Sequence, residues 1–109
     1  IRSALASEPD NPALLDSLGW VLYRRGQYAA AVSELARAYR LLHDGDVGAH
    51  WGEALWAAGQ KAEARSAWQR ALAADPDNKT LAATVHRYAP TLTAPKPPPA
   101  LEPAPRTSI

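Results

Sequence analysis

The chain has 109 residues, which is enough for one small domain. It contains no cysteine, which excludes disulfides and cysteine-ligated zinc. Its 12 basic and 11 acidic side chains give a formal net charge of +1, a balance that favours neither nucleic acid nor an anionic membrane surface. No apolar run approaches the ~20 residues that span a bilayer. We therefore expect no nucleic-acid partner and no direct membrane insertion of this chain.

Apolar residues at helical spacing predict five helices in chain order. They cover residues 11–25, 28–42, 47–58, 61–74 and 79–88. Asn11 is suited to cap the first helix and Pro12 fits its first turn, while Gly26 ends it. Asp44 and Gly45 are expected to form the turn that precedes the third helix.

The sequence repeats itself at a spacing of 33 to 34 residues. Gly19 and Gly26 return as Gly52 and Gly59, each 33 positions later. The same register gives Leu15-x2-Leu18-Gly19-x2-Leu22 and Ala31-x3-Leu35 in one unit, then Trp51-Gly52-x2-Leu55 and Ala64-x3-Trp68 in the next. This period and this content resemble the tetratricopeptide repeat (TPR), a helix–turn–helix unit of ~34 residues. The resemblance implies an all-α fold, a right-handed stack of antiparallel helical hairpins.

The repeat register divides the chain into five parts. Residues 1–11 are expected to end a preceding TPR, residues 12–44 and 45–78 to form two TPRs, and residues 79–89 to form a capping helix over the last apolar face. Residues 90–109 carry seven prolines, so we expect a Pro-rich, disordered C-terminal tail. That tail is either inert or a proline-rich ligand for another domain. Because the chain has no methionine, we expect a C-terminal fragment of a larger protein.

Three departures from the TPR pattern concern packing. Gly48 stands where the family prefers a large residue, and we expect the Trp51 ring to fill the space that it leaves. His43 stands where a closing proline is usual. Trp51 and Trp68 take the places of core Leu and Phe residues in the pattern, so both are interpreted as structural.

The candidate binding surface is the side of each hairpin's first helix that core packing leaves free, which lines the concave face of stacked hairpins. Trp, Tyr and Arg are enriched among interface hot spots, and they recur on this side. The predicted partner-binding residues are Asp16, Trp20, Tyr23, Arg24, Glu53, Trp56 and Arg87. Ala49 is expected on the same side. The alternative is that Trp20 and Trp56 pack between adjacent repeats with one edge exposed.

The resemblance also limits the kind of partner. Some TPR domains hold the C-terminal carboxylate of chaperones with Lys, Asn and Arg on this face, whereas this chain carries Asp16, Trp20 and Glu53. A peptide of mixed polarity or a folded protein fits better. The run from Asp16 to Gly26 looks like the last repeats of proteobacterial TPR proteins, some of them outer-membrane lipoproteins that act as adaptors for periplasmic proteases. This likeness leaves two locations open, the bacterial cytoplasm and the cell envelope.

No set of residues predicts catalysis or a cofactor. His43, His50 and His86 lack a metal-binding spacing. Asp16 and Glu53 are able to face one another, but no pattern predicts a catalytic pocket around them. We therefore predict a non-enzymatic scaffold or adaptor that binds a protein or peptide partner on the concave face. The alternatives are self-association, for example as a homodimer, and a regulatory appendage of an upstream enzyme.

Overall fold

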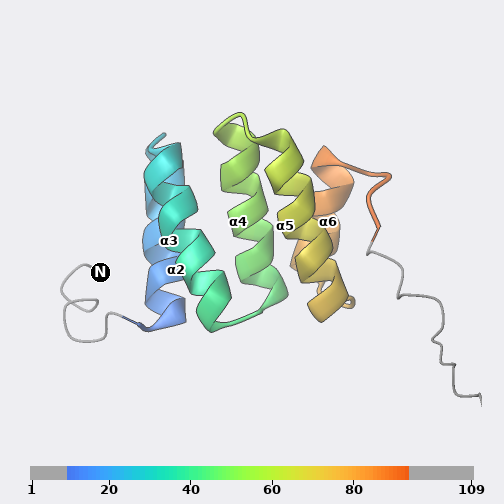
Figure 1. The fold of residues 1–109 in the computed structure, drawn as a ribbon, viewed down its shortest axis with the longest axis horizontal. Coiled ribbons are helices and arrows are strands. Elements are labelled where there is room, and N and C mark those ends of the chain that lie inside the picture. Colours follow the sequence, from blue (N-terminus) through green and yellow to red (C-terminus); the bar gives the residue numbers. More distant parts are fainter. Residues whose placement is uncertain (1–9, 94–109) are drawn as a thin grey trace, which may run out of the picture.

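The computed structural model describes residues 10–93, and this part of the chain contains five α-helices and no strand. The helices are α2 (Pro12–Arg24), α3 (Tyr28–Leu41), α4 (Gly45–Ala57), α5 (Lys61–Ala74) and α6 (Lys79–Tyr88). They stand side by side, with α3 in front of α2 and α5 in front of α6 in the view of Figure 1. The predicted all-α fold is confirmed.

Neighbouring helices pair in chain order. α2 packs on α3 and α4 packs on α5, which gives two antiparallel hairpins. α4 also contacts α3 and α2, so it joins the hairpins, and α6 packs chiefly on α4. Within the described residues, the backbones of α3 and α5 do not approach each other closely, although Arg70 of α5 extends over the Tyr39 ring of α3. The result is a short solenoid with α2, α4 and α6 in succession, and with α3 and α5 on the side that faces the reader in Figure 1.

Side-chain caps and glycines set where the helices begin and end. The Asn11 side chain accepts hydrogen bonds from two amides in the first turn of α2, at 3.0 and 3.2 Å. Asn78 caps α6 in the same way, at 2.8 Å. Such caps satisfy amides that have no partner within the helix. Gly26 and Gly59 have φ angles of +79° and +87°, a left-handed conformation that lets each hairpin turn tightly.

The start of α4 differs from the expectation. Asp44 is the N-cap, with its carboxylate 2.6 Å from the amide of Asp46, and Gly45 is the first helical residue. The prediction that the helix begins at 47 was therefore wrong. The Gly45 amide donates to Asp75 Oδ2 at 3.0 Å, and an added Cβ at Gly45 would lie 2.6 Å from the Asn78 side chain. The close approach of the next interhelical turn explains why this helix opens with glycine.

Two hydrophobic clusters hold the stack together, one within the first hairpin and at α4, the other reaching all five helices. Trp68 on α5 is the largest fully buried side chain, and its Nε1 donates to the carbonyl of Ala49 at 3.3 Å. An added Cβ at Gly52 would collide with this indole, so glycine provides the space for the ring. The structural interpretation of Trp68 is confirmed. Trp51 is partly buried and packs against both clusters.

The space beside Gly48 is filled by Ala71 and Tyr39, and not by Trp51. An added Cβ at Gly48 would lie 2.5 Å from Ala71 Cβ and 3.2 Å from the Tyr39 ring. The expectation for Trp51 was wrong because α5 approaches α4 closely where two small residues face each other. The Trp51 ring instead stacks on Tyr39, with ring centroids 5.3 Å apart.

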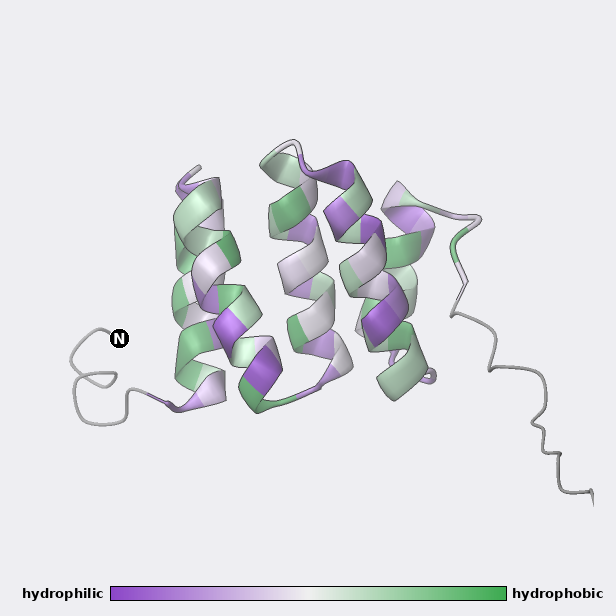
Figure 2. Ribbon diagram, in the orientation of Figure 1, coloured by the Kyte–Doolittle hydropathy of each residue, from purple (hydrophilic) through white to green (hydrophobic). Residues whose placement is uncertain are grey.

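Hydrophobic and hydrophilic residues alternate along each helix, as amphipathic packing requires (Figure 2). No helix within residues 10–93 is both long and apolar enough to cross a membrane. The expected end of a preceding repeat (residues 1–11) and the Pro-rich tail (residues 90–109) lie largely outside the described residues. Both remain predictions.

Candidate functional site

Six side chains on α2, α4 and α6 contact one another in a row that crosses all three helices. All six are partly exposed. We call this row the stripe; it consists of Asp16, Trp20, Tyr23, His50, Glu53 and Tyr88. It forms because α4 packs on both α2 and α6, so that side chains of these three helices lie next to one another.

The α2 end of the stripe is a stack of rings. Trp20 lies nearly parallel to Tyr23, with ring centroids 4.6 Å apart and an interplanar angle of 15°. Trp20 also stacks on His50 of α4, with centroids 4.2 Å apart. His50 Nδ1 lies 2.8 Å from Asp16 Oδ1, which makes an ion pair when the imidazole is protonated. Trp20 is thus held in a fixed orientation although it belongs to neither hydrophobic cluster.

Glu53 links the three helices. Tyr23 of α2 and Tyr88 of α6 both donate a hydroxyl hydrogen to Glu53 Oε2, at 3.3 and 2.7 Å. Both donors are neutral, and no cation among residues 10–93 forms an ion pair with this carboxylate. Glu53 Oε1 accepts no hydrogen bond from the described residues. The stripe therefore contains a carboxylate that forms no ion pair with the described residues.

The two tyrosines remain hydrogen-bond donors at neutral pH. Burial raises the pKa of the Tyr23 hydroxyl, and the charge of Glu53 raises it further. Burial also raises the pKa of the Tyr88 hydroxyl, together with its hydrogen bond to Glu53 and the charge of that carboxylate. A phenolate would place a second negative charge beside the first, which is unfavourable in a partly buried site. Glu53 and the two hydroxyls that bind it thus carry a single negative charge together.

Opposing effects act on His50. Burial by itself would lower its pKa, but the hydrogen bond to Asp16 and the charges of Asp16, Glu53 and Asp46 outweigh burial and raise it. The protonated ring neutralises Asp16 directly, because that carboxylate lies within hydrogen-bond distance. This pair does not extend to a metal centre: in residues 10–93, no group of three His, Asp or Glu side chains is arranged to hold a metal ion.

Four of the seven predicted binding residues, Asp16, Trp20, Tyr23 and Glu53, lie in the stripe, and the other three lie beside it or apart from it. Arg87 extends over the ring of Tyr88, with its guanidinium carbon 5.3 Å from the ring centroid. Arg24 is exposed and makes no side-chain interaction with the described residues. The role of all seven in binding stays a prediction.

Trp56 packs between helices. Its ring lies 5.8 Å from that of Trp68 and 5.5 Å from that of Tyr88, measured between centroids. The Lys61 ammonium lies 5.0 Å from the same ring centroid. Trp56 therefore packs within its own hairpin and against the capping helix α6, and it reaches the stripe through Tyr88.

Sequence comparisons agree with this architecture. Models of the tetratricopeptide repeat match residues 1–46 and residues 49–78. The chain belongs to the tetratricopeptide repeat family. One relative is the TPR repeat-containing protein PA4667 of Pseudomonas aeruginosa, which is 45% identical over 53 residues. This match covers 49% of the present chain but 9% of the Pseudomonas protein. No solved structure matches.

Two stripe residues of this TPR chain, His50 and Tyr88, are absent from the sequence-based prediction. Asp16 and His50 are 34 positions apart, and Glu53 and Tyr88 are 35 apart, so each pair is separated by about one repeat. A search for polar or aromatic pairs at this separation on successive first helices would have found both. Asp16 and Glu53 do not form a pair, because Asp16 bonds to His50, and Ala49 is fully buried rather than exposed.

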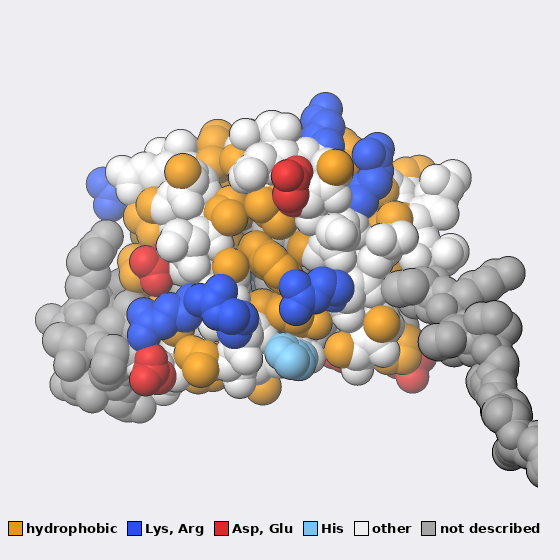
Figure 3. Space-filling view, viewed as in Figure 1, with side chains coloured by type: hydrophobic (Ala, Val, Ile, Leu, Met, Phe, Trp, Pro, Cys, Tyr) orange, Lys and Arg blue, Asp and Glu red, His pale blue; other side chains and the backbone are white. Residues whose placement is uncertain are grey.

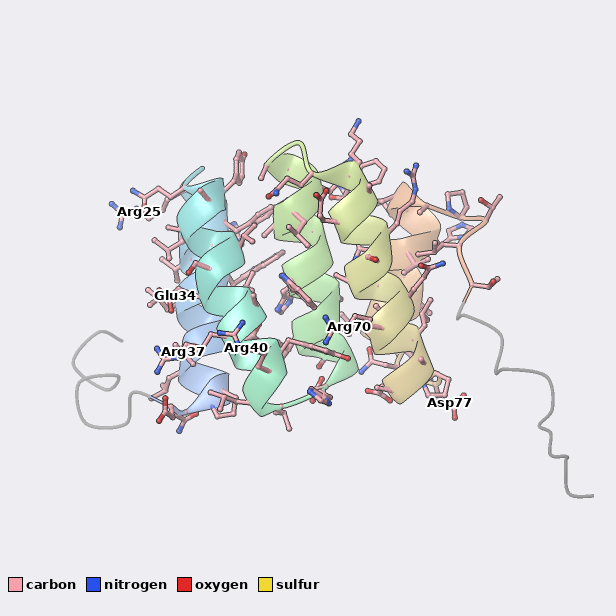
Figure 4. The ribbon with its side chains drawn as sticks, in the orientation of Figure 1. Arg25, Glu34, Arg37, Arg40, Arg70 and Asp77 are labelled. Carbon is pink, nitrogen blue, oxygen red and sulfur yellow. The ribbon has the colours of Figure 1, made fainter. Side chains whose placement is uncertain are left out.

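The other side of the TPR stack carries an apolar groove between α3 and α5. Its volume is about 310 Å³, and it is lined by Val32, Ala36, Trp51, Leu55, Glu63, Ser66, Ala67 and Arg70. Figure 3 shows hydrophobic side chains gathered there between basic ones, and Figure 4 places Arg70 near the middle of this side. The Arg70 guanidinium lies 5.5 Å from the ring centroid of Trp51 and 5.9 Å from that of Tyr39. Arg70 thus lies over Trp51, which lines the groove, and over Tyr39 beside it.

Proposed function

We propose that this chain is a scaffold or adaptor module that binds a protein or peptide partner across the stripe. TPR repeats in general mediate protein–protein interaction and are not catalytic. The observation that carries the finer proposal is the continuity of the stripe. Aromatic rings and a carboxylate from α2, α4 and α6 meet in one partly exposed row.

The chemistry of the stripe suits protein recognition. Trp and Tyr are the side chains that most often carry binding energy at protein interfaces, because they bury a large apolar area with few rotatable bonds. Trp20 and Tyr23 are stacked on each other, and Tyr23 is also fixed by Glu53. Binding to side chains that are already ordered loses little conformational entropy. A partner laid along α2, α4 and α6 would contact these rings in turn.

The test is partner capture from a lysate of the source organism by three versions of the chain: unchanged, Trp20→Ala and Leu41→Ala. Leu41 on α3 is 47% exposed, so its truncation removes an exposed hydrophobic side chain away from the stripe. We expect a partner, identified by mass spectrometry, to be retained by the unchanged chain and by Leu41→Ala, and lost from Trp20→Ala. Circular dichroism checks that all three are equally helical. Equal retention by Trp20→Ala would remove the stripe as the binding surface.

A second candidate function is self-association through the first hairpin. The large hydrophobic side chains that are exposed among residues 10–93 all belong to this hairpin or follow it directly: Val21, Tyr28, Leu41 and Leu42. Apolar surface of this kind favours contact with another protein surface. Sedimentation at increasing protein concentration tests this function. If the chain sediments with the mass of a monomer at every concentration, a homodimer is excluded. A mass that rises with concentration, and that returns to the monomer value in Leu41→Arg, would support self-association.

A further inference from the structure

We propose that Glu53 receives an arginine side chain of the partner, in a subsite bordered by Tyr23 and Tyr88. The inference rests on the proposed partner binding and adds the chemistry of the partner. The partner segment would carry an arginine between apolar residues. Charge complementarity at Glu53 and the aromatic surroundings of this carboxylate carry the argument.

The charge of Glu53 lies in a partly buried environment without a cationic partner among residues 10–93. Its carboxylate is partly buried, both of its hydrogen-bond donors are neutral hydroxyls, and both bind the same oxygen, Oε2. A partly buried charge is costly unless it is paired, because it has lost part of its hydration. The described residues provide no ion pair for Glu53 and no donor for Oε1. A cation from the partner would supply both.

The two acidic residues of the stripe differ in their partners. Asp16 has a titratable cation, His50, at hydrogen-bond distance. Glu53 has none. The carboxylate of Asp16 is therefore paired within the chain, whereas that of Glu53 forms no ion pair with the described residues.

The surroundings of Glu53 favour an arginine over a lysine. The rings of Tyr23 and Tyr88 reach Glu53 from α2 and α6, so aromatic groups lie on two sides of the carboxylate along the stripe. A guanidinium is planar, stacks on aromatic faces and donates two parallel hydrogen bonds to a carboxylate, whereas an ammonium is a compact and strongly hydrated charge. Rings on this part of the chain already attract cations, since Arg87 extends over Tyr88 and Lys61 over Trp56. Neither of those cations forms an ion pair with Glu53.

Two indoles lie beside the proposed arginine subsite. Trp20 stacks on Tyr23 on one side of the subsite, and Trp56 contacts Tyr88 on the other. Residues of the partner that precede and follow the arginine would meet these indoles. Apolar flanking residues fit them best, because they exchange hydration for contact with large apolar rings.

The experiment uses three pools of short synthetic peptides with identical apolar flanking positions and a fixed central residue: arginine, citrulline or glutamate. Citrulline has the shape of arginine without its charge. The whole 109-residue chain is titrated with each pool, and binding is followed by nuclear magnetic resonance at the indole N–H signals of the tryptophans. The same titrations are made with Glu53→Gln and with Glu63→Gln as the matched control. Glu63 lines the α3–α5 groove, so its change removes the same charge from the other side.

We expect the arginine pool to bind the unchanged chain at least about tenfold more tightly than the citrulline pool, as a charge-assisted hydrogen-bonded pair implies. The preference should disappear in Glu53→Gln and persist in Glu63→Gln. Equal affinity for arginine and citrulline pools would overturn the subsite, and this comparison needs no variant. If all three pools shift the indole signals equally, the stripe still binds peptides and only the arginine inference fails. If no pool binds while Trp20→Ala still abolishes partner capture, the proposed function stands and the arginine subsite is rejected.

Discussion

The two sides of this TPR stack both present aromatic rings, but they differ in how their charges are satisfied. On the α3–α5 side, the chain supplies its own cation, since Arg70 lies over Trp51 and Tyr39. On the stripe, Glu53 is bound by neutral hydroxyls and has no cation within the described residues. Glu63 in the groove also forms no ion pair within residues 10–93, but it is exposed and keeps its hydration, whereas Glu53 is partly buried. A cation from a partner therefore stabilises the charge of Glu53 more than that of Glu63. The difference favours the stripe as the interface over the α3–α5 groove on the other side.

Two tryptophans allow the same comparison within one residue type. Trp68 is completely buried at the centre of the larger cluster, while Trp20 lies in the stripe and outside both clusters. If the stripe serves binding and the clusters serve folding, truncation of each indole should produce opposite patterns of stability loss and partner loss.

The largest expected effect is that of Trp68→Ala. It removes a fully buried indole and the hydrogen bond that this indole donates to the Ala49 carbonyl. We expect the free energy of unfolding to fall by about 3–5 kcal/mol, as for other large-to-small substitutions in cores. Urea unfolding followed by circular dichroism measures it. A loss below about 1 kcal/mol would show that the ring is not part of a close-packed core.

Trp20→Ala should have a smaller effect on stability and a larger one on binding. The indole contributes stacking with Tyr23 and His50, and such aromatic pairs contribute about 0.5–1.5 kcal/mol each beyond area burial. We therefore expect a modest decrease in the free energy of unfolding, together with loss of the partner captured by the unchanged chain. If Trp20→Ala is as destabilising as Trp68→Ala, the stripe belongs to the core and the contrast between the two regions disappears.

The fold was largely predictable from the sequence, because one period governs it. Glycines at a 33-residue spacing, apolar residues at helical spacing and the Asn11 cap predicted the all-α hairpin stack. The start of α4 was mispredicted because the Asp44–Gly45 pair is typical of turns. Only the close approach of Asp75 and Asn78 from the next turn shows that glycine is needed inside the helix there.

The stripe was predictable in part. Its aromatic and acidic residues on α2 and α4 follow from the helical face that packing leaves free. The places of His50 and Tyr88 do not follow from it. Their contacts depend on how far neighbouring helices are shifted along each other, which pairs each side chain with a residue about one repeat away. The same offset explains why Trp56 turns toward Trp68 and Tyr88 although it stands one repeat after Tyr23.

Arg70→Ala tests the other side of the comparison. The substitution removes the cation from above Trp51 and Tyr39, interactions that contribute about 0.5–1 kcal/mol at exposed sites. We expect a small decrease in thermal stability and no change in partner capture. Arg40→Ala, which removes an exposed arginine of α3, is the matched control for the loss of charge. A partner lost from Arg70→Ala but retained by Arg40→Ala would move the interface to the groove.

The smallest expected effect is a pH dependence that separates the two acidic residues of the stripe. Asp16 pairs with His50, a group that titrates near neutral pH, whereas the partners of Glu53 are tyrosine hydroxyls that stay neutral there. The pKa of His50 is raised in the folded chain above its ordinary value of about 6.5, since the hydrogen bond and negative charges outweigh burial. The stabilisation from this pair is therefore fully present below about pH 6.5 and is lost as the pH rises through the folded-state pKa. For a partly exposed pair, we expect less than about 1 kcal/mol. Urea unfolding across this range measures it, and Asp16→Asn should flatten the dependence, since the burial of His50 then opposes protonation with one carboxylate fewer. If the free energy of unfolding of His50→Gln changes with pH as it does in the unchanged chain, another group causes the pH dependence. Asp16 would then not differ from Glu53 in having a cationic partner.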